Sequence, residues 1–88
     1  MKKDEIINFL ESLVFKRFKS KAKIYEYIKS NFKSYKIMLE YHDHDLPGID
    51  YNFIGTIENK DLLCDFDLYY TKTKANEMLI VEVAYEFQ

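Results

Sequence analysis

The sequence predicts an α+β fold in which two N-terminal helices pack on one face of a four-stranded antiparallel sheet, in the order ααββββ. Three observations predict it: a helical hydrophobic period up to about residue 33, a period of two after residue 34, and short polar links between the alternating segments. The 88 residues are expected to form a single domain, 1–88, because a chain of this length supports only one small core. Aromatic residues, 17% of the sequence, supply much of that core.

The two helices are predicted from helical spacing and capping residues. In the first, from Asp4 to about Lys16, the apolar residues fall within one half of the helical wheel, and Asp4 is suited to cap the N-terminus. Ser20 can cap a second helix that runs to about Lys33. The join between them is short, which favours a packed helical hairpin.

Four strands are predicted from alternating apolar and polar residues. They cover residues 36–42, roughly Asp50 to Glu58, Leu62 to Tyr70, and Met78 to Phe87. The links HDLPG, ENKD and TKTKANE are short, which favours an antiparallel meander. In the last strand the alternation assigns Ile80 to the outer face and places on the apolar face Leu79, Val81, Val83, Tyr85 and Phe87.

The N-terminal segment and the single cysteine bear on the compartment. Polar residues interrupt the apolar run IINFLESLVF, which a secretory signal or a membrane span would not tolerate. Cys64 cannot form an internal disulfide, so the fold needs no oxidising environment. We therefore expect a cytoplasmic protein without a membrane partner. Cys64 also falls on the apolar side of its strand, which indicates a buried small hydrophobe rather than a nucleophile.

Charge divides the chain into two halves, although the net charge is only −2. Residues 1–36, the predicted basic helical hairpin, carry ten Lys or Arg against four acids, a charge of +6. Residues 37–88, the predicted acidic sheet, carry three Lys against eleven acids, a charge of −8. An asymmetry of this size bears on partners rather than on fold.

The segment HDHDLPGID, His42 to Asp50, has the side-chain chemistry of a metal site. A His-x-His pair at the end of a strand would send His42 and His44 to the same side. Asp45 and the following Pro-Gly are, however, typical of a turn, and a hairpin tip is normally polar. An HD-type phosphohydrolase would need further His and Asp ligands, and the chain has only two histidines, so that family is rejected. We predict a solvated loop with no metal and no cofactor.

Two other carboxylate patterns imitate catalytic sites. Asp50 with Glu58 and Lys60 resembles the acid, acid-x-lysine pattern of restriction-type nucleases, but the two acids lie about 26 Å apart on one extended strand, too far to share a metal. Asp65-x-Asp67 points two carboxylates to one face, as in metal-dependent transferases. With two glycines the chain has no Gly-rich phosphate loop to accompany them. We therefore predict that the protein is not an enzyme.

The remaining candidate site is a group of acidic residues on one face of the predicted sheet. The outer face of the predicted sheet carries Glu40, Glu58, Asp65, Asp67, Glu82 and Glu86, interleaved with Asn52, Thr56, Tyr69 and Ile80. In the last hairpin, Asp65 and Asp67 are expected as direct or diagonal neighbours of Glu82, an arrangement of like charges that costs stability. A carboxylate array of this kind suits a basic partner surface. The expected contact residues also include Tyr69 and the loop residues His42, Asp43, His44 and Asp45.

These observations favour a small inhibitor that blocks a basic nucleic-acid-handling enzyme, with its carboxylates standing in for phosphates. In size, in its expected cytoplasmic location and in its ααββββ order with an acidic sheet, the chain resembles bacterial toxin-immunity proteins, phage anti-CRISPR proteins and small acidic DNA mimics. The resemblance covers overall architecture and includes no shared motif. It implies a protein partner with a basic surface, such as a nuclease, a toxin or a CRISPR effector, and no catalytic residues.

Three alternative functions stay open. The first is a nucleic-acid-binding module that uses the clustered cations Lys16, Arg17, Lys19, Lys21, Lys23, Lys29, Lys33 and Lys36. The acidic half argues against direct nucleic-acid binding because it would repel the same ligand. The second alternative is a metal-dependent enzyme at the HDHD loop, which ranks lowest. The third is self-association, in which the basic helices of one copy meet the acidic sheet of another in a homodimer.

Overall fold

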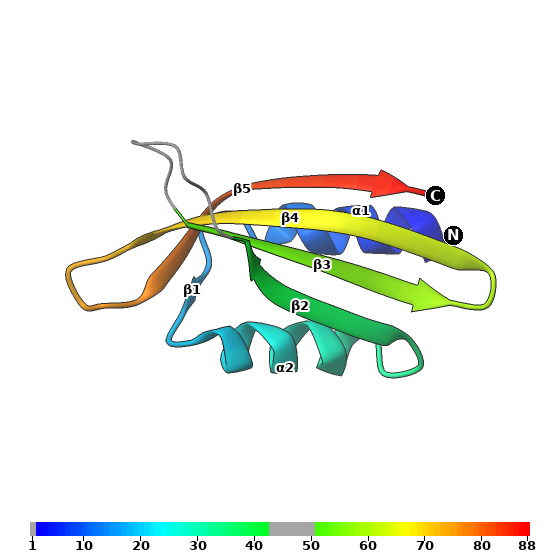
Figure 1. The fold of residues 1–88 in the computed structure, drawn as a ribbon, viewed down its shortest axis with the longest axis horizontal. Helices are drawn as coiled ribbons and strands as arrows, with labels where there is room; N and C mark the ends of the chain where they lie inside the picture. The colour runs from blue at the N-terminus through cyan, green and yellow to red at the C-terminus, as the bar shows by residue number, and fades with distance from the viewer. Residues whose placement is uncertain (1, 43–50) are drawn as a thin grey trace.

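A computed structural model describes residues 2–42 and 51–88, and it confirms the predicted α+β class (Figure 1). Within these described residues, two helices and five strands follow one another. They are α1 (Lys2–Ser12), β1 (Arg17–Phe18), α2 (Lys21–Asn31), β2 (Lys36–His42), β3 (Tyr51–Asn59), β4 (Leu62–Lys72) and β5 (Met78–Phe87).

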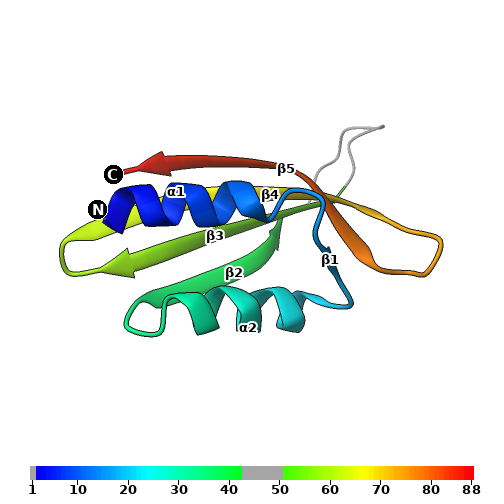
Figure 2. The ribbon, with the colours of Figure 1, turned by 180° about the vertical axis from the view of Figure 1, so that it is seen from behind.

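The strands form one antiparallel sheet in the order β1-β5-β4-β3-β2. The predicted meander of the four long strands is therefore confirmed. The sheet curls into a half-barrel, and both helices lie on its inner side, with α1 near β4 and β5 and α2 along β2 (Figures 1 and 2). The outer face of the sheet is consequently not covered by either helix.

The core fills the space between the helices and the inner face of the sheet. Helix α1 contributes Ile6 and Leu10, and α2 contributes Ile24 and Ile28, all fully buried. Ser20 caps α2 as predicted, because its hydroxyl oxygen accepts a hydrogen bond of 3.2 Å from the Lys23 backbone N–H. Helix α2 therefore begins where the sequence places it, whereas the predicted bounds of the first helix are wrong: α1 runs from Lys2 to Ser12, so Asp4 lies in its first turn instead of capping it.

Strand β1 is a feature that the sequence does not predict. Arg17 and Phe18 pair with β5 rather than forming a plain join between two helices. The helices are thus separated by a strand, although their aromatic residues touch: the ring of Phe9 on α1 packs against the rings of Tyr27 and Phe32, with centroids 5.6 and 5.0 Å away. The predicted direct join between the helices is therefore wrong. A two-residue strand is too short to show alternation, so the sequence pattern could not reveal it.

A β-bulge at Val81 reverses the expected face of the first half of β5. Tyr69 pairs with Glu82 and Tyr70 with Ile80, so Val81 is left as an extra residue on β5. Ile80 is fully buried and Val81 is 38% exposed, which contradicts their predicted positions on the outer and inner faces. Consecutive apolar residues around Ile80 conceal the shift, because either alternation places an apolar side chain in the core.

Candidate functional site: an acidic outer sheet face

The outer face of the sheet brings together the six carboxylates predicted for it. Along each strand these carboxylate residues alternate with residues that face the core. One side of β2, β3, β4 and β5 is therefore acidic. We define the acidic face by its residues Glu40, Glu58, Asp65, Asp67, Glu82 and Glu86. All of them are exposed or half-buried.

The carboxylates are densest where β4 pairs with β5. Asp65 lies directly opposite Glu86, and Asp67 lies opposite Ala84. Asp67 is therefore the diagonal neighbour of both Glu82 and Glu86, at the roughly 7–8 Å that separates diagonal residues of a sheet. The sequence predicts Asp65 as well as Asp67 near Glu82, but the register places Asp65 beside Glu86 and away from Glu82.

Tyr69 lies in the middle of this carboxylate group. It pairs with Glu82 across β5 and lies on the same side of β4 as Asp67. Burial is the largest cause that raises the pKa of the Tyr69 phenol, and the charges of Asp67 and Glu82 raise it further. The phenol consequently stays protonated and can donate a hydrogen bond to a partner.

The remaining predicted contact residues lie toward β2 and the end of the sheet. Glu40 is opposite Ile54 on β3, and Glu58 is opposite Lys36, which is a cation at the rim of the acidic face. Exposed His42 ends β2. The other predicted loop residues, Asp43, His44 and Asp45, lie outside the described residues. Asp50 of the nuclease pattern also lies outside them.

Asn52 is not part of the exposed surface, although the sequence predicts it among the outer-face residues. Its side chain is 2% exposed, and its amide donates hydrogen bonds to the backbone carbonyls of Phe53 at 2.9 Å and Leu68 at 3.1 Å. A buried amide needs such partners, and the bond to Leu68 ties β3 to β4, whereas the bond to Phe53 stays within β3. Asn52 is therefore a structural residue at the end of the sheet.

The carboxylates of the acidic face lack salt bridges to other described residues. Within residues 2–42 and 51–88 the only ion pair joins Lys23 and Glu26 on α2, at 3.6 Å. Asp65 accepts a hydrogen bond of 2.6 Å from the Gln88 side-chain amide, which carries no charge. Lys36 lies opposite Glu58, but none of the six carboxylates is held in an ion pair by a cation of the described residues.

The cations lie mostly on the helical side of the molecule, where several contact aromatic rings. The Lys16 ammonium lies 5.7 Å from the centre of the Tyr27 ring, and the Lys21 ammonium lies 5.4 Å from that of Tyr41. Both helices lie on one side of the sheet (Figure 2), so the basic first half of the sequence and the carboxylates of the acidic face lie largely on opposite sides of the fold.

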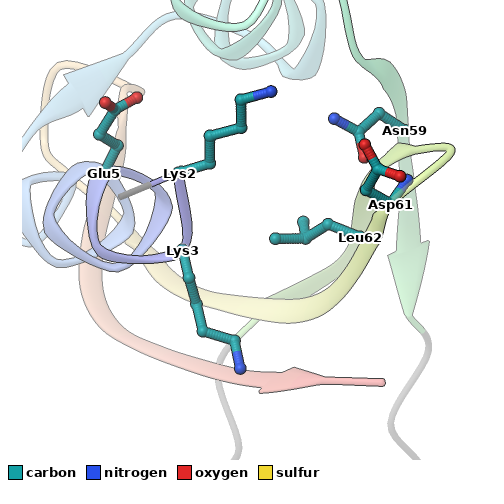
Figure 3. A pocket seen from close by; sticks show the side chains of 6 residues that line it. All are labelled: Lys2, Lys3, Glu5, Asn59, Asp61 and Leu62. Atoms are coloured by element: carbon teal, nitrogen blue, oxygen red, sulfur yellow. The ribbon is translucent and has the colours of Figure 1, made fainter.

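A pocket of about 490 Å³ lies between the start of α1 and the turn that joins β3 to β4. Its lining mixes both charges and one apolar side chain, and Figure 3 shows Leu62 extending toward the helix. The lining residues are Lys2, Lys3, Glu5, Asn59, Asp61 and Leu62. Because its lining carries both charges, the pocket does not gather side chains of one charge as the acidic face does.

The described residues contain no group of three or more His, Cys, Asp or Glu side chains that could hold a metal ion. Cys64 is fully buried, as the sequence predicts. Burial raises the pKa of its thiol to about 11, and the nearby charge of Asp65 adds to the effect. The thiol therefore stays protonated at neutral pH, a state in which it is a poor nucleophile.

Comparison with protein-family models, with curated proteins and with solved structures returns no match for this chain. In the part of the chain that the structure describes, no helix has the length and apolar character needed to cross a membrane.

Proposed function

We propose that the protein is a small non-catalytic inhibitor that binds a basic nucleic-acid-handling enzyme through its acidic face. The observation that carries the proposal is the group formed by Asp67, Glu82 and Glu86, whose carboxylates are neighbours on β4 and β5 and have no ion pair within the described chain. This arrangement costs stability in the free protein, since like charges on adjacent strands repel. A partner that supplies cations removes that repulsion when it binds.

The inhibitor would act by occupying the enzyme's substrate channel. Enzymes that handle nucleic acids use Lys and Arg to contact phosphates, and a carboxylate array offers the same sign of charge to those cations. Electrostatic complementarity of this kind accelerates association and selects the partner. The toxin-immunity and anti-defence proteins of bacteria and phages are the class of cytoplasmic inhibitor that this proposal describes, and the partner is a nuclease, a toxin or a CRISPR effector.

The proposal is tested with two double charge reversals that change the net charge equally. Asp67→Lys with Glu82→Lys alters the acidic face, and Glu5→Lys with Glu26→Lys alters the helices as the matched control. Each protein is titrated against a panel of purified basic nucleases, nuclease toxins and CRISPR effectors. We expect at least one of these enzymes to be inhibited, with affinity reduced roughly 100-fold or more by the face reversal, because close interfacial charge pairs couple by several kcal/mol.

Two results would contradict the proposal. Equal loss of inhibition in the face and helix variants would mean that net charge, rather than the acidic face, determines binding. Failure to inhibit any enzyme of the panel, together with direct binding of nucleic acid, would transfer the function to the basic side. Sedimentation of the free protein tests self-association in the same samples.

A second candidate function, binding of single-stranded nucleic acid, is favoured by exposed aromatic rings beside the basic helix. Tyr41 and Tyr51 are each 55% exposed, and Tyr51 stacks on Tyr70 with ring centres 5.1 Å apart. Lys21 lies over the Tyr41 ring. Exposed rings next to cations can stack bases and contact phosphates. Salt-sensitive binding of oligo(dT) that is lost in Tyr41→Ala would support this function over the inhibitor.

A further inference from the structure

Strand β5 has a free outer edge after the bulge at Val81. The neighbouring strand β1 pairs only with Leu79 and Met78. The contact ends at Ile80, whose carbonyl accepts a hydrogen bond of 2.7 Å from the Phe15 N–H and whose N–H donates one of 3.0 Å to the Lys16 carbonyl. No other described strand borders the remainder of β5 on that side (Figure 1). Helix α1 lies behind β4 and β5, on the inner face of the sheet, rather than beyond this edge (Figures 1 and 2).

The hydrogen-bonding groups on this edge can be assigned from the register. The Gln88 backbone N–H donates to the Leu63 carbonyl at 2.9 Å, so Gln88 directs its backbone toward β4. Backbone direction alternates along a strand, so Gln88, Glu86 and Ala84 direct their N–H and C=O groups toward β4, and the residues that alternate with them direct theirs away from β4. These residues are Val83, Tyr85 and Phe87.

An apolar patch stands at the start of the free edge. Phe15 is 75% exposed, and Val81, which follows Ile80 in the bulge, is 38% exposed. Phe15 also has a φ of 72°, in the left-handed region that bulky residues avoid. A large apolar side chain kept in a strained and exposed position points to a contact with a partner, because neither packing nor backbone preference favours phenylalanine there.

The side chains of β5 define what an added strand would carry. On the outer side, Glu82 and Glu86 belong to the acidic face, so the outward residues of the added strand would be Lys or Arg. On the inner side, Val83, Tyr85 and Phe87 are half-buried and offer apolar surface to an added strand, although α1 already contacts two of them: the Tyr85 hydroxyl donates a hydrogen bond of 2.8 Å to Glu11, and the Lys3 ammonium lies 4.9 Å from the centre of the Phe87 ring. For a second copy of β5, antiparallel pairing about Ala84 brings Glu82 opposite Glu86, which disfavours that register, and no register offers the cations that the acidic face lacks.

We propose that an extended segment of the basic partner, alternating Lys or Arg with apolar residues, adds to β5 as a sixth strand. Main-chain hydrogen bonds to Val83, Tyr85 and Phe87 hold the segment, and its cations reach the acidic face. The apolar patch of Phe15 and Val81 covers one end of the segment. This mode of binding rests on the proposed function, since it identifies how a partner meets the carboxylates.

The test uses the full chain and a synthetic decapeptide that alternates lysine and valine, followed by NMR amide hydrogen exchange. We expect the added peptide to slow exchange of the Val83, Tyr85 and Phe87 amides by roughly tenfold or more, because each gains a backbone hydrogen bond. Unchanged exchange at all three amides with the peptide at millimolar concentration overturns the proposal. Slowed exchange confined to the β2 edge also overturns it.

A proline substitution separates the edge from the charges. Val83→Pro removes the outward N–H at position 83 and leaves every hydrogen bond to β4 in place, as proline on an edge strand permits. Val83→Ala is the matched control, since it shortens the side chain and keeps the N–H. We expect Val83→Pro to weaken the peptide roughly tenfold relative to Val83→Ala, and equal affinities overturn the proposal. If Val83→Pro does not fold, Phe15→Asn serves instead, with weaker peptide binding expected and unchanged binding overturning the apolar contact.

Failure of the edge and failure of the proposed function give different results. If Asp67→Lys with Glu82→Lys abolishes inhibition of the enzyme while Val83→Pro leaves it unchanged, the acidic face binds without strand addition and only the edge proposal is wrong. If inhibition survives the charge reversals, the proposed function is wrong whatever happens at the edge.

Discussion

Phe66 on β4 lies directly across from Gly55 on β3, and its ring occupies the space that a side chain at position 55 would need. A Cβ at position 55 would come within 2.4 Å of the Phe66 Cζ and within 2.7 Å of the Met38 carbonyl oxygen on β2. Because one of these atoms belongs to the backbone, the clash cannot be relieved by moving the ring alone. Gly55 thus allows Phe66 to fill the middle of the inner face.

We expect Gly55→Ala to lower the free energy of unfolding by about 1–3 kcal/mol, the usual cost of overpacking a core. Urea unfolding followed by circular dichroism measures the change. Thr56→Ala, one residue further along the same strand but on the outer face, is the control and should change stability much less. A Gly55→Ala protein as stable as the parent would show that Phe66 can move without cost.

Phe15→Asn is expected to stabilise the free protein. A left-handed backbone costs a bulky residue about 1–2 kcal/mol, whereas asparagine tolerates it, as Asn76 does at a φ of 62°. The Phe15 side chain is mostly exposed, so little packing is lost with it. The thermal midpoint of Phe15→Asn should exceed that of Phe15→Ala, which removes the ring but keeps the strained backbone. Equal midpoints would argue against strain at position 15.

The fold could be predicted because its long elements carry clear periods. Alternation over seven or more residues identifies β2, β3, β4 and β5, and Ser20 marks the start of α2. Strand β1 could not be predicted, since two residues have no period and their pairing depends on β5, 60 positions away in the sequence. The bulge at Val81 could not be predicted either, because consecutive apolar residues lead up to it and the sequence pattern does not show which of them face the core.

The acidic face could be predicted because side chains alternate with a period of two in every strand, which places its six carboxylates on one side. The exact neighbours could not, since they depend on register: Asp65 meets Glu86 only because the bulge shifts β5 by one residue. The burial of Asn52 also could not be predicted, because the Leu68 carbonyl that accepts from its amide lies on another strand. Alternation alone cannot identify a polar residue that is buried at the end of a sheet.

Removal of one charge from the acidic face should stabilise the free protein. We expect Asp67→Asn to raise the free energy of unfolding by a few tenths of a kcal/mol, up to about 1, at low salt, because its neighbours Glu82 and Glu86 then face a neutral side chain. The gain should shrink at 1 M salt, which screens exposed charges. Glu26→Gln, which breaks the ion pair with Lys23, is the control and should not stabilise. A gain that is unchanged by salt would indicate a cause other than repulsion.

Stability is expected to fall at alkaline pH through Cys64. Its thiol has an ordinary pKa of 9.0, which burial raises to about 11 in the folded protein. Below pH 9 the thiol is protonated in both states, but between pH 9 and 11 only the unfolded chain loses the proton. Ionisation then favours unfolding, and the free energy of unfolding falls by up to about 1.4 kcal/mol per pH unit.

The contribution of Cys64 can be separated from that of Tyr70, whose pKa burial raises from 10.0 to about 12. Unfolding by urea at pH 8, 9, 9.5 and 10 covers the range in which the thiol titrates before the phenol. Cys64→Ala lowers stability at every pH through the cavity that it creates, but its stability should depend less on pH across this range than that of the parent. Parallel pH profiles of the two proteins would mean that the buried thiol does not couple folding to alkaline pH.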